Sequence, residues 1–237
     1  MRFPSALQRG RLLQRYKRFL ADVVLDSGEQ VTAACPNTGA MLGLTATGSV
    51  VWLSKSDSAT RKYAHTWELV EADLGAGPTL VGINPLHPNK LVAEAIETGC
   101  VKKLAGYSSL RREVGYGEAS RIDLLLEDAR KGRCYVEVKN VHLMRTAGRA
   151  EFPDCVTERG AKHLRELTQM VAQGHRAVMV YLIQRDDAQR FAIARDFDPN
   201  YAEAFRLATA AGVEALAFGC RMSTDAISLD APVRIAR

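Results

Sequence analysis

Residues 176–183, RAVMVYLI, form an almost uninterrupted apolar run in the C-terminal half of the chain. A run of this length fits a central β-strand that is covered on both faces. A helix is predicted before it in the sequence, from Thr157 to Gln173, and another after it, from Asp198 to Ala211. Each of these segments begins at a good capping residue and ends just before a glycine. These elements together require a sheet with helices packed against it.

Further elements precede this strand. A helix is predicted from Asn89, as its N-cap, to Thr98, because Gly99 lies just beyond its end. The predicted strands are Arg112–Tyr116, Ser120–Glu127 and Arg133–Val141, and VEALAFG at residues 213–219 supplies a last one. The resulting order, α-β-β-β-α-β-α-β, predicts a mixed sheet flanked by helices over residues 83–237, in an α/β domain.

Residues 1–82 have a different texture. Short strand-like runs alternate there with turn signals such as Asp26-Ser27-Gly28. The predicted strands are Phe19–Leu25, Gln30–Ala34, Ser49–Ser54 and His65–Val70. A five-stranded β-barrel of the OB type fits this length, although another small β-domain would give the same spacing. The chain is therefore expected to hold an OB-like β domain followed by the α/β domain.

The segment CYVEVKNV, residues 134–141, carries charge where a core strand is expected. Because side chains alternate between the two faces of a strand, Val136 and Val138 share one face, while Glu137 and Lys139 share the other with Tyr135. Burying charges costs free energy unless they are paired or bind a metal. The pattern therefore indicates either a functional pair or an exposed salt bridge on an edge strand.

A carboxylate on the preceding strand favours a functional pair. Asp123, in SRIDLLLE, can lie near Glu137 if the two strands form a hairpin. Two converging carboxylates repel each other, and a hard divalent cation such as Mg²⁺ or Mn²⁺ relieves that repulsion. Lys139 would stabilise charge on a phosphoryl group beside the metal. The predicted metal ligands are Asp123, Glu137 and the carbonyl of Val138; the predicted catalytic residues are Asp123, Glu137, Lys139 and, from the first helix, Glu94.

This layout resembles the PD-(D/E)XK nuclease superfamily, with Asp123 followed by Glu137-Val138-Lys139 as E-x-K. The three letters alone occur in many proteins. Three things add weight: the motif lies on a predicted strand, an Asp lies on the strand before it, and the order of elements matches the α-β-β-β-α-β core of that superfamily.

Basic residues gather in segments that suit a nucleic-acid backbone. Near the N-terminus, cations alternate with Tyr16 and Phe19, which favours contact with phosphates and bases. The predicted DNA-binding residues are Arg11, Arg15, Lys17, Arg18, Arg61, Lys62, Arg159 and Lys162. A protected strand edge or a solvated helix face would look the same. The net charge of +5 permits a polyanionic partner without demanding one.

Cysteine usage and hydropathy bear on location. The five cysteines are dispersed, with no CxxC and no zinc-site spacing, which predicts free thiols in a reducing compartment. The N-terminus lacks an apolar segment of signal-peptide length, and no run approaches the length of a membrane span. A cytoplasmic protein without membrane contact is expected, and the sequence sets no oligomeric state.

Several long segments carry a wider resemblance. They are RGRLLQRYKRFLADV, CPNTGAM, GSVVWLS, TWELVE, LVAEAI, GYGEASRIDLLLE, CYVEVKNV, FPDCVTERGAKHLREL and DPNYAEA. Together they resemble the bacterial sugar fermentation stimulation protein A family over nearly the whole chain. The resemblance implies an OB-like and a nuclease-like domain, DNA binding, and a role in regulating sugar (maltose) metabolism. It also carries over Asp123, Glu137, Lys139 and Glu94 as site residues.

The leading hypothesis is a DNA-binding protein, largely without sequence preference, whose metal site hydrolyses phosphodiesters. The alternative is a non-catalytic DNA-binding regulator that uses the same fold only for binding. RNA is a further candidate partner, because OB domains accept single strands of either kind.

Overall fold

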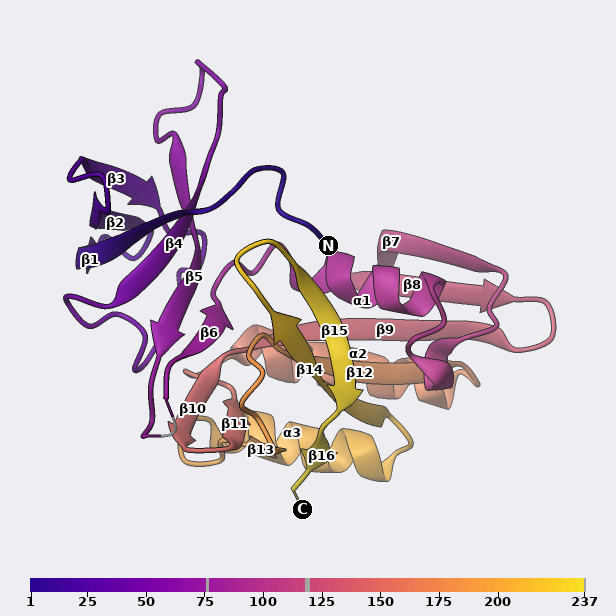
Figure 1. The fold of residues 1–237 in the computed structure, drawn as a ribbon. Coiled ribbons are helices and arrows are strands. Elements are labelled where there is room, and N and C mark those ends of the chain that lie inside the picture. Colours follow the sequence, from indigo (N-terminus) through magenta and orange to yellow (C-terminus); the bar gives the residue numbers. More distant parts are fainter. Residues whose placement is uncertain (76, 118–119, 237) are drawn as a thin grey trace.

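The computed structural model describes residues 1–75, 77–117 and 120–236. A small barrel at the N-terminal end is followed by a layered α/β part (Figure 1). The strands of the first part are β1 (Gln8–Tyr16), β2 (Leu20–Leu25), β3 (Gln30–Ala34), β4 (Val50–Lys55), β5 (His65–Ala72) and β6 (Thr79–Gly82). The first five close into a ring, because β3 pairs with β5, and β6 extends the sheet from β5. This closed five-stranded barrel confirms the predicted OB-like fold.

Alternating side chains fill the barrel. Leu12, Val23, Val51 and Leu53 are fully buried, whereas their neighbours along the strand reach solvent at least in part. This period of two is typical of strands with one buried face. The predicted strands match β2 to β5 closely. β1 and β6 were not predicted; the four residues of β6 are too few to show a period.

The α/β part is built on a six-stranded mixed sheet with the order β15-β14-β12-β9-β8-β7. Its strands are β7 (Ser109–Tyr116), β8 (Ser120–Asp128), β9 (Gly132–Val141), β12 (Arg176–Ile183), β14 (Glu214–Met222) and β15 (Ile227–Pro232). β12 runs parallel to both β9 and β14, and seven of its eight residues are buried. RAVMVYLI is therefore the central strand that the sequence predicts.

Helices cover both faces of this sheet (Figure 1). They are α1 (Pro88–Glu97), α2 (Glu158–Ala172) and α3 (Pro199–Ala210), with a 3-10 turn η1 at Lys102–Leu104. Val136 and Val138 of β9 pack with α1, while Tyr135 and Val141 pack with α2 and α3 on the opposite face. The predicted order of elements and the predicted faces of this strand are confirmed, and with them the mixed-sheet, nuclease-like fold class.

Two of the three predicted helix starts are confirmed by their caps. The Thr157 side chain accepts a hydrogen bond from Gly160 N at 3.0 Å, and that of Asp198 accepts one from Tyr201 N at 2.9 Å. The prediction of Asn89 as a cap is wrong: α1 begins at Pro88, after His87. Proline at the first helical position sets this start because its φ already suits the first turn. Asn89 therefore lies within the helix.

A second, four-stranded sheet lies near α3 (Figure 1). Its strands are β10 (Leu143–Thr146), β11 (Arg149–Phe152), β13 (Arg190–Ile193) and β16 (Arg234–Ile235). None of them was predicted, because two to four residues are too few to show a period. β15 was also missed, since the predicted chain of elements stops at β14.

The two parts contact each other directly. Gly82 N at the end of β6 donates to the carbonyl of Gln184 at 2.8 Å, and Met41 N donates to the Asp154 carboxylate at 3.4 Å. Residues 1–3, which precede the first barrel strand, pair with the turn before β15. All five cysteines are unpaired thiols. No helix in the described ranges has the length and apolar character needed to cross a membrane.

Candidate active site

β8 and β9 separate at one end of their ladder. Their pairing stops at Leu124 and Val136. One residue further, a side chain replaces the backbone partner: Asp123 Oδ2 accepts a hydrogen bond from Val138 N at 2.7 Å. The strands thus form a fork with Asp123 on one arm and Glu137 on the other, which we call the β8–β9 fork.

Two N–H donors hold Asp123 at the fork. Besides Val138 N, the side-chain amide of Asn89 on α1 donates to Oδ1 at 2.8 Å. Burial and then the negative charge of Glu137 raise the pKa of Asp123 to about 6, in spite of these two bonds. A carboxylate that is costly to ionise is stabilised by nearby positive charge. A cation bound beside Asp123 would therefore stabilise its ionised carboxylate.

Glu137 is only 2% exposed, and its two oxygens differ. Oε1 accepts from Lys139 Nζ at 2.7 Å and is bonded to Nδ1 of His163. Burial would raise the pKa of Glu137, but the bond from His163 and the charge of Lys139 outweigh it and lower the pKa. Oε2 is buried and has no hydrogen-bond partner among the described residues. Oε1 therefore has two hydrogen-bond partners, whereas Oε2 has none among the described residues; we call Oε2 the open oxygen of Glu137.

His163 reaches Glu137 from α2. On its other side, Arg159 Nε donates to His163 Nε2 at 3.3 Å. A guanidinium can only donate, so Nε2 accepts and the ring proton is assigned to Nδ1, facing Glu137. Sequence reasoning missed this histidine. The available signal was its place on the buried stripe of the helix, four residues before Leu167 and seven before Met170.

Glu166, one turn further along α2, adds a third buried carboxylate. Its Oε1 accepts from Ser120 Oγ at 2.8 Å and lies 3.6 Å from Lys162 Nζ, while Oε2 has no partner within the part of the chain that is described. The phenol of Tyr116 lies among these acids: burial, followed by the charges of Glu137 and Glu166, raises its pKa. The fork is therefore richer in buried acids than the sequence pattern indicates.

The fourth predicted catalytic residue, Glu94, is not brought to this fork. Its side chain is 51% exposed, and its carboxylate lies 3.0 Å from the amino group of Met1. The α1 residue that reaches Asp123 is Asn89, five positions earlier and thus on another face of the helix. Asn89 Nδ2 also lies 3.4 Å from Glu113 on β7, whose exposed carboxylate is therefore near Asp123. Asn89 stands where Glu94 was expected.

Four of the predicted DNA-binding residues are exposed, two in the barrel and two on α2, the helix that carries His163. Lys17 and Arg18 are exposed in the turn between β1 and β2. Arg159 and Lys162 follow, exposed on α2. We call these four cations the basic strip.

The other predicted DNA-binding residues contact groups of the barrel. Arg15 donates to three carbonyl oxygens, in the turn after β1 and in the loop after β3. Arg11 binds a carbonyl of the loop before β4, and Arg61 binds a hydroxyl group on β5. Lys62 lies over the ring of Tyr63, 5.5 Å from its centroid. Arg15 is therefore the most firmly held of these four residues, and their contact with DNA stays a prediction.

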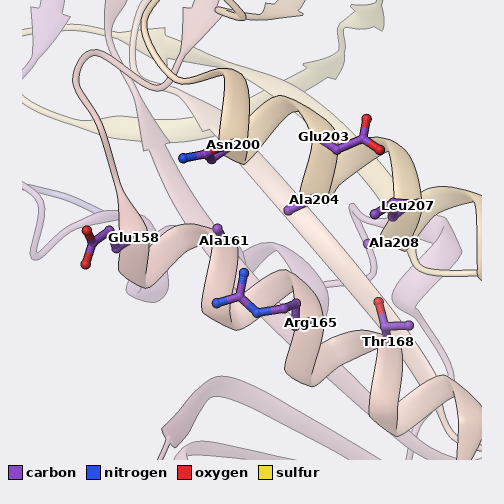
Figure 2. A pocket seen from close by; sticks show the side chains of 9 residues that line it. All are labelled: Glu158, Ala161, Arg165, Thr168, Asn200, Glu203, Ala204, Leu207 and Ala208. Carbon is purple, nitrogen blue, oxygen red and sulfur yellow. The ribbon is translucent and has the colours of Figure 1, made fainter.

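A groove of about 680 Å³ runs between α2 and α3 (Figure 2). Ala161 on α2 and Ala204, Leu207 and Ala208 on α3 form its apolar part. It uses a different face of α2 from the one that carries His163, and none of the fork's side chains line it. The groove and the fork are therefore separate features.

The fork meets the requirements of a hard divalent cation. Asp123 and the open oxygen of Glu137 are oxygen donors of the kind that Mg²⁺ and Ca²⁺ prefer. Within the described ranges, no three His, Cys, Asp or Glu side chains are grouped so as to enclose a metal on their own. Mg²⁺ sites commonly use only one or two carboxylates and keep several waters. The residues present fit a site of this kind, in which the protein supplies two carboxylates and water supplies most of the remaining ligands.

Comparisons with known proteins agree along the whole chain. The model described as the SfsA N-terminal OB domain matches residues 13–83, and the one described as the sugar fermentation stimulation protein RE domain matches residues 86–226. The chain is 59% identical over 229 residues to a sugar fermentation stimulation protein homolog of Azorhizobium caulinodans, covering 97% of each chain. It is 58% identical over 236 residues to one of Rhodospirillum centenum, covering 100% of each. Among solved structures it resembles Pyrococcus furiosus SfsA in complex with Ca²⁺, with a TM-score of 0.87, 27% identity, and coverage of 100% of this chain and 98% of that one.

Proposed function

The chain belongs to the sugar fermentation stimulation protein family, and from this premise we propose that it binds DNA and hydrolyses phosphodiester bonds at the β8–β9 fork with Mg²⁺ or Mn²⁺. The observation that carries the proposal is the open oxygen of Glu137, a buried carboxylate atom without a partner in the described chain and close to a second carboxylate. Burying such an atom is costly unless something binds it. A cation is the simplest group that would satisfy it, and the P. furiosus relative is described in complex with Ca²⁺.

Asp123 and Glu137 Oε2 would hold the cation. The carbonyl of Val138 would join them, because the N–H and C=O groups of one strand residue point to the same side and this N–H faces Asp123. When bound, such a cation polarises a phosphoryl oxygen and lowers the pKa of a bound water. These three groups lie on two adjacent strands, so the fork positions them without any loop.

Lys139 and His163 have different roles in this proposal. In the hydrolysis, a water oxygen bonds to phosphorus, one P–O ester bond breaks, and the leaving oxygen takes up a proton. The Lys139 ammonium, 2.7 Å from Glu137 Oε1, would stabilise the negative charge that builds on the phosphoryl oxygens. His163 donates to the same oxygen, which fixes the carboxylate and leaves Oε2 for the cation. We therefore treat His163 as a positioning residue.

The basic strip would guide DNA to the fork. Its four cations are exposed, two in the barrel turn and two on the helix that carries His163. Contacts with phosphates position a strand but carry no sequence information, so binding is expected to be largely independent of sequence. Because OB barrels accept single strands of DNA or RNA, RNA belongs among the substrates to be tested.

One experiment tests the nuclease. Purified protein is incubated with single- and double-stranded DNA and RNA in Mg²⁺, in Mn²⁺ and in EDTA. We expect metal-dependent cleavage that falls by about 10²-fold or more in Glu137→Ala and in Lys139→Ala. Glu127→Ala is the matched control, since this carboxylate on β8 pairs with the surface arginines Arg111 and Arg133.

Binding distinguishes the two candidate functions. All of these variants should still bind DNA, with an affinity that falls as salt rises. The double variant Lys17→Ala with Arg18→Ala should bind more weakly and show a smaller salt dependence. If every variant binds and none of them, nor the parent protein, cleaves any substrate, the non-catalytic regulator is the correct function.

We further infer that the protein acts in the cytoplasm, where its five free cysteines stay reduced. Its action on DNA would then underlie the link with sugar (maltose) metabolism that the family resemblance implies. A strain that lacks the gene, complemented with Glu137→Ala, tests this link. Growth on maltose restored as well as by the parent gene would separate the physiological role from catalysis.

A further inference from the structure

A pocket of about 800 Å³ opens between α3, β13 and the start of β14. Along the central sheet, strand β12 lies between it and the β8–β9 fork, because the pocket adjoins β14 and the fork includes β9. α2 accompanies the fork, whereas α3 lines this pocket, and the two places share no residue. The pocket is therefore a separate site from the proposed nuclease centre.

Four arginines line this pocket: Arg149, Arg190, Arg195 and Arg206. Two of them belong to a row of like charges across the small sheet. Arg149 of β11 pairs with Arg190 of β13, and Arg190 pairs with Arg234 of β16. Side chains at paired positions on neighbouring strands project from the same face of the sheet. Like charges at such positions destabilise the sheet. An anion that binds there would offset this cost.

The nearby carboxylates neutralise only two of the four pocket arginines. Glu151 pairs with Arg149 and Glu203 pairs with Arg206, while Asp196 pairs with Arg145 outside the pocket. Neither Arg190 nor Arg195 has a carboxylate at ion-pair distance in the part of the chain that the structure describes. These two guanidinium groups remain available to a ligand.

The space between the arginines is apolar. Phe205 of α3, Ile193 at the end of β13 and Ile235 of β16 are half-buried around it, and Ala192 and Ala202 are buried beneath. A small inorganic anion would make no favourable contact with these apolar side chains, which we call the apolar floor of the pocket. The combination of cations and apolar side chains suits a ligand that has both a multiply charged end and a flat apolar part.

We propose that this arginine pocket binds a nucleotide, with the phosphates on the arginines and the base against Phe205 and the two isoleucines. Guanidinium groups bind phosphate oxygens in a bidentate manner. Bases pack on apolar and aromatic side chains with little regard to sequence. The same chemistry belongs to a free nucleoside polyphosphate and to a nucleotide within a single strand, and competition separates these two sources.

Binding is measured with ATP, with inorganic tripolyphosphate and with an oligothymidylate of about 12 nucleotides, a length within the range of single-strand sites. EDTA is present throughout, and the full chain carries Glu137→Ala, so that metal-dependent binding at the fork does not contribute. The test variant is Arg190→Ala with Arg195→Ala. The control is Arg130→Ala with Arg221→Ala, which makes the same change in net charge at exposed positions outside the pocket.

The test variant should lose at least about tenfold in ATP affinity, while the control keeps the parent affinity. Tripolyphosphate should bind several-fold more weakly than ATP, because it makes no use of the apolar floor. Displacement of ATP by the oligothymidylate identifies a strand as the source of the nucleotide, and its failure to displace ATP identifies a free nucleotide. Equal affinities for ATP and tripolyphosphate, or equal losses in the variant and the control, would overturn the proposal. Neither result bears on cleavage at the fork.

Discussion

In the β8–β9 fork, Glu137 and Glu166 are buried, and each has one carboxylate oxygen without a hydrogen-bond partner among the described residues. In the arginine pocket, Arg190 and Arg195 are exposed, and Arg190 stands between two like charges. An unpaired buried charge costs several kcal/mol, whereas water largely screens an exposed one. The fork is thus suited to one small cation, and the pocket to a larger anion that covers several guanidinium groups. Changes of charge should have large effects at the fork and small ones in the pocket.

The largest effect is expected from Asp123→Asn in the absence of metal. The folded protein holds the Asp123 proton more tightly than the unfolded chain does, since the pKa rises from 3.8 to about 6 on folding. Ionised Asp123 therefore destabilises the fold at pH values above its folded pKa. The variant should raise the free energy of unfolding by about 1–3 kcal/mol at pH 8, and this gain should disappear by about pH 4. Urea unfolding in EDTA across this pH range measures it.

Asp128→Asn, at the other end of β8, should act in the opposite direction. The backbone N–H groups of Arg130 and Lys131 lower the pKa of Asp128, so its ionised form stabilises the fold. Loss of this charge should therefore lower the free energy of unfolding at neutral pH.

Added Mn²⁺ should stabilise the parent protein but not Asp123→Asn. A gain from Asp123→Asn that is equal at pH 4 and pH 8 would mean that packing, and not charge, causes it.

A smaller effect is expected at His163, which acts through Glu137. His163→Ala should weaken Mn²⁺ binding by about 10–100-fold, the usual effect of losing a partner that orients a metal ligand. His163→Asn should retain most of the affinity, since its amide can replace the Nδ1 donor. His175→Ala is the control, because this half-buried ring packs against Tyr135, away from the proposed ligands.

Calorimetric titration of metal-free protein with Mn²⁺ measures these affinities. Unfolding curves of the same variants report stability separately, so a loss of metal affinity can be distinguished from partial unfolding. If His163→Ala and His163→Asn bind Mn²⁺ as tightly as the parent protein, His163 does not position Glu137.

The fold could be predicted wherever one segment carries a long enough pattern. The apolar run of β12, the alternation in β9 and the capped starts of α2 and α3 are all local signals, and the structure confirms them. β10, β11, β13 and β16 are too short to show a period, and they exist only because distant segments pair. The arginine row could not be predicted for this reason, since its register across three strands is set by tertiary structure.

The same distinction holds within the fork. The approach of Asp123 to Glu137 follows from a hairpin between neighbouring strands, which a sequence can indicate. The residues supplied by helices depend on how each helix is rotated against the sheet, which is decided by packing over the whole layer. This is why Asn89 lies at the site where Glu94 was expected, and why His163 was missed.

The smallest expected effect concerns the arginine row itself. Arg190→Thr removes the middle charge between Arg149 and Arg234 and introduces a residue that suits a strand. In low salt and without nucleotide, the free energy of unfolding should rise by about 0.2–1 kcal/mol, the size of a cross-strand pair, and this gain should shrink as salt screens the charges. Arg112→Thr on the edge strand β7, where the paired residue is Leu124, controls for strand propensity. With ATP present, the parent protein should become the more stable of the two, because it keeps the ligand that the variant loses. A variant that stays more stable under both conditions would show that the row destabilises the sheet without serving a ligand.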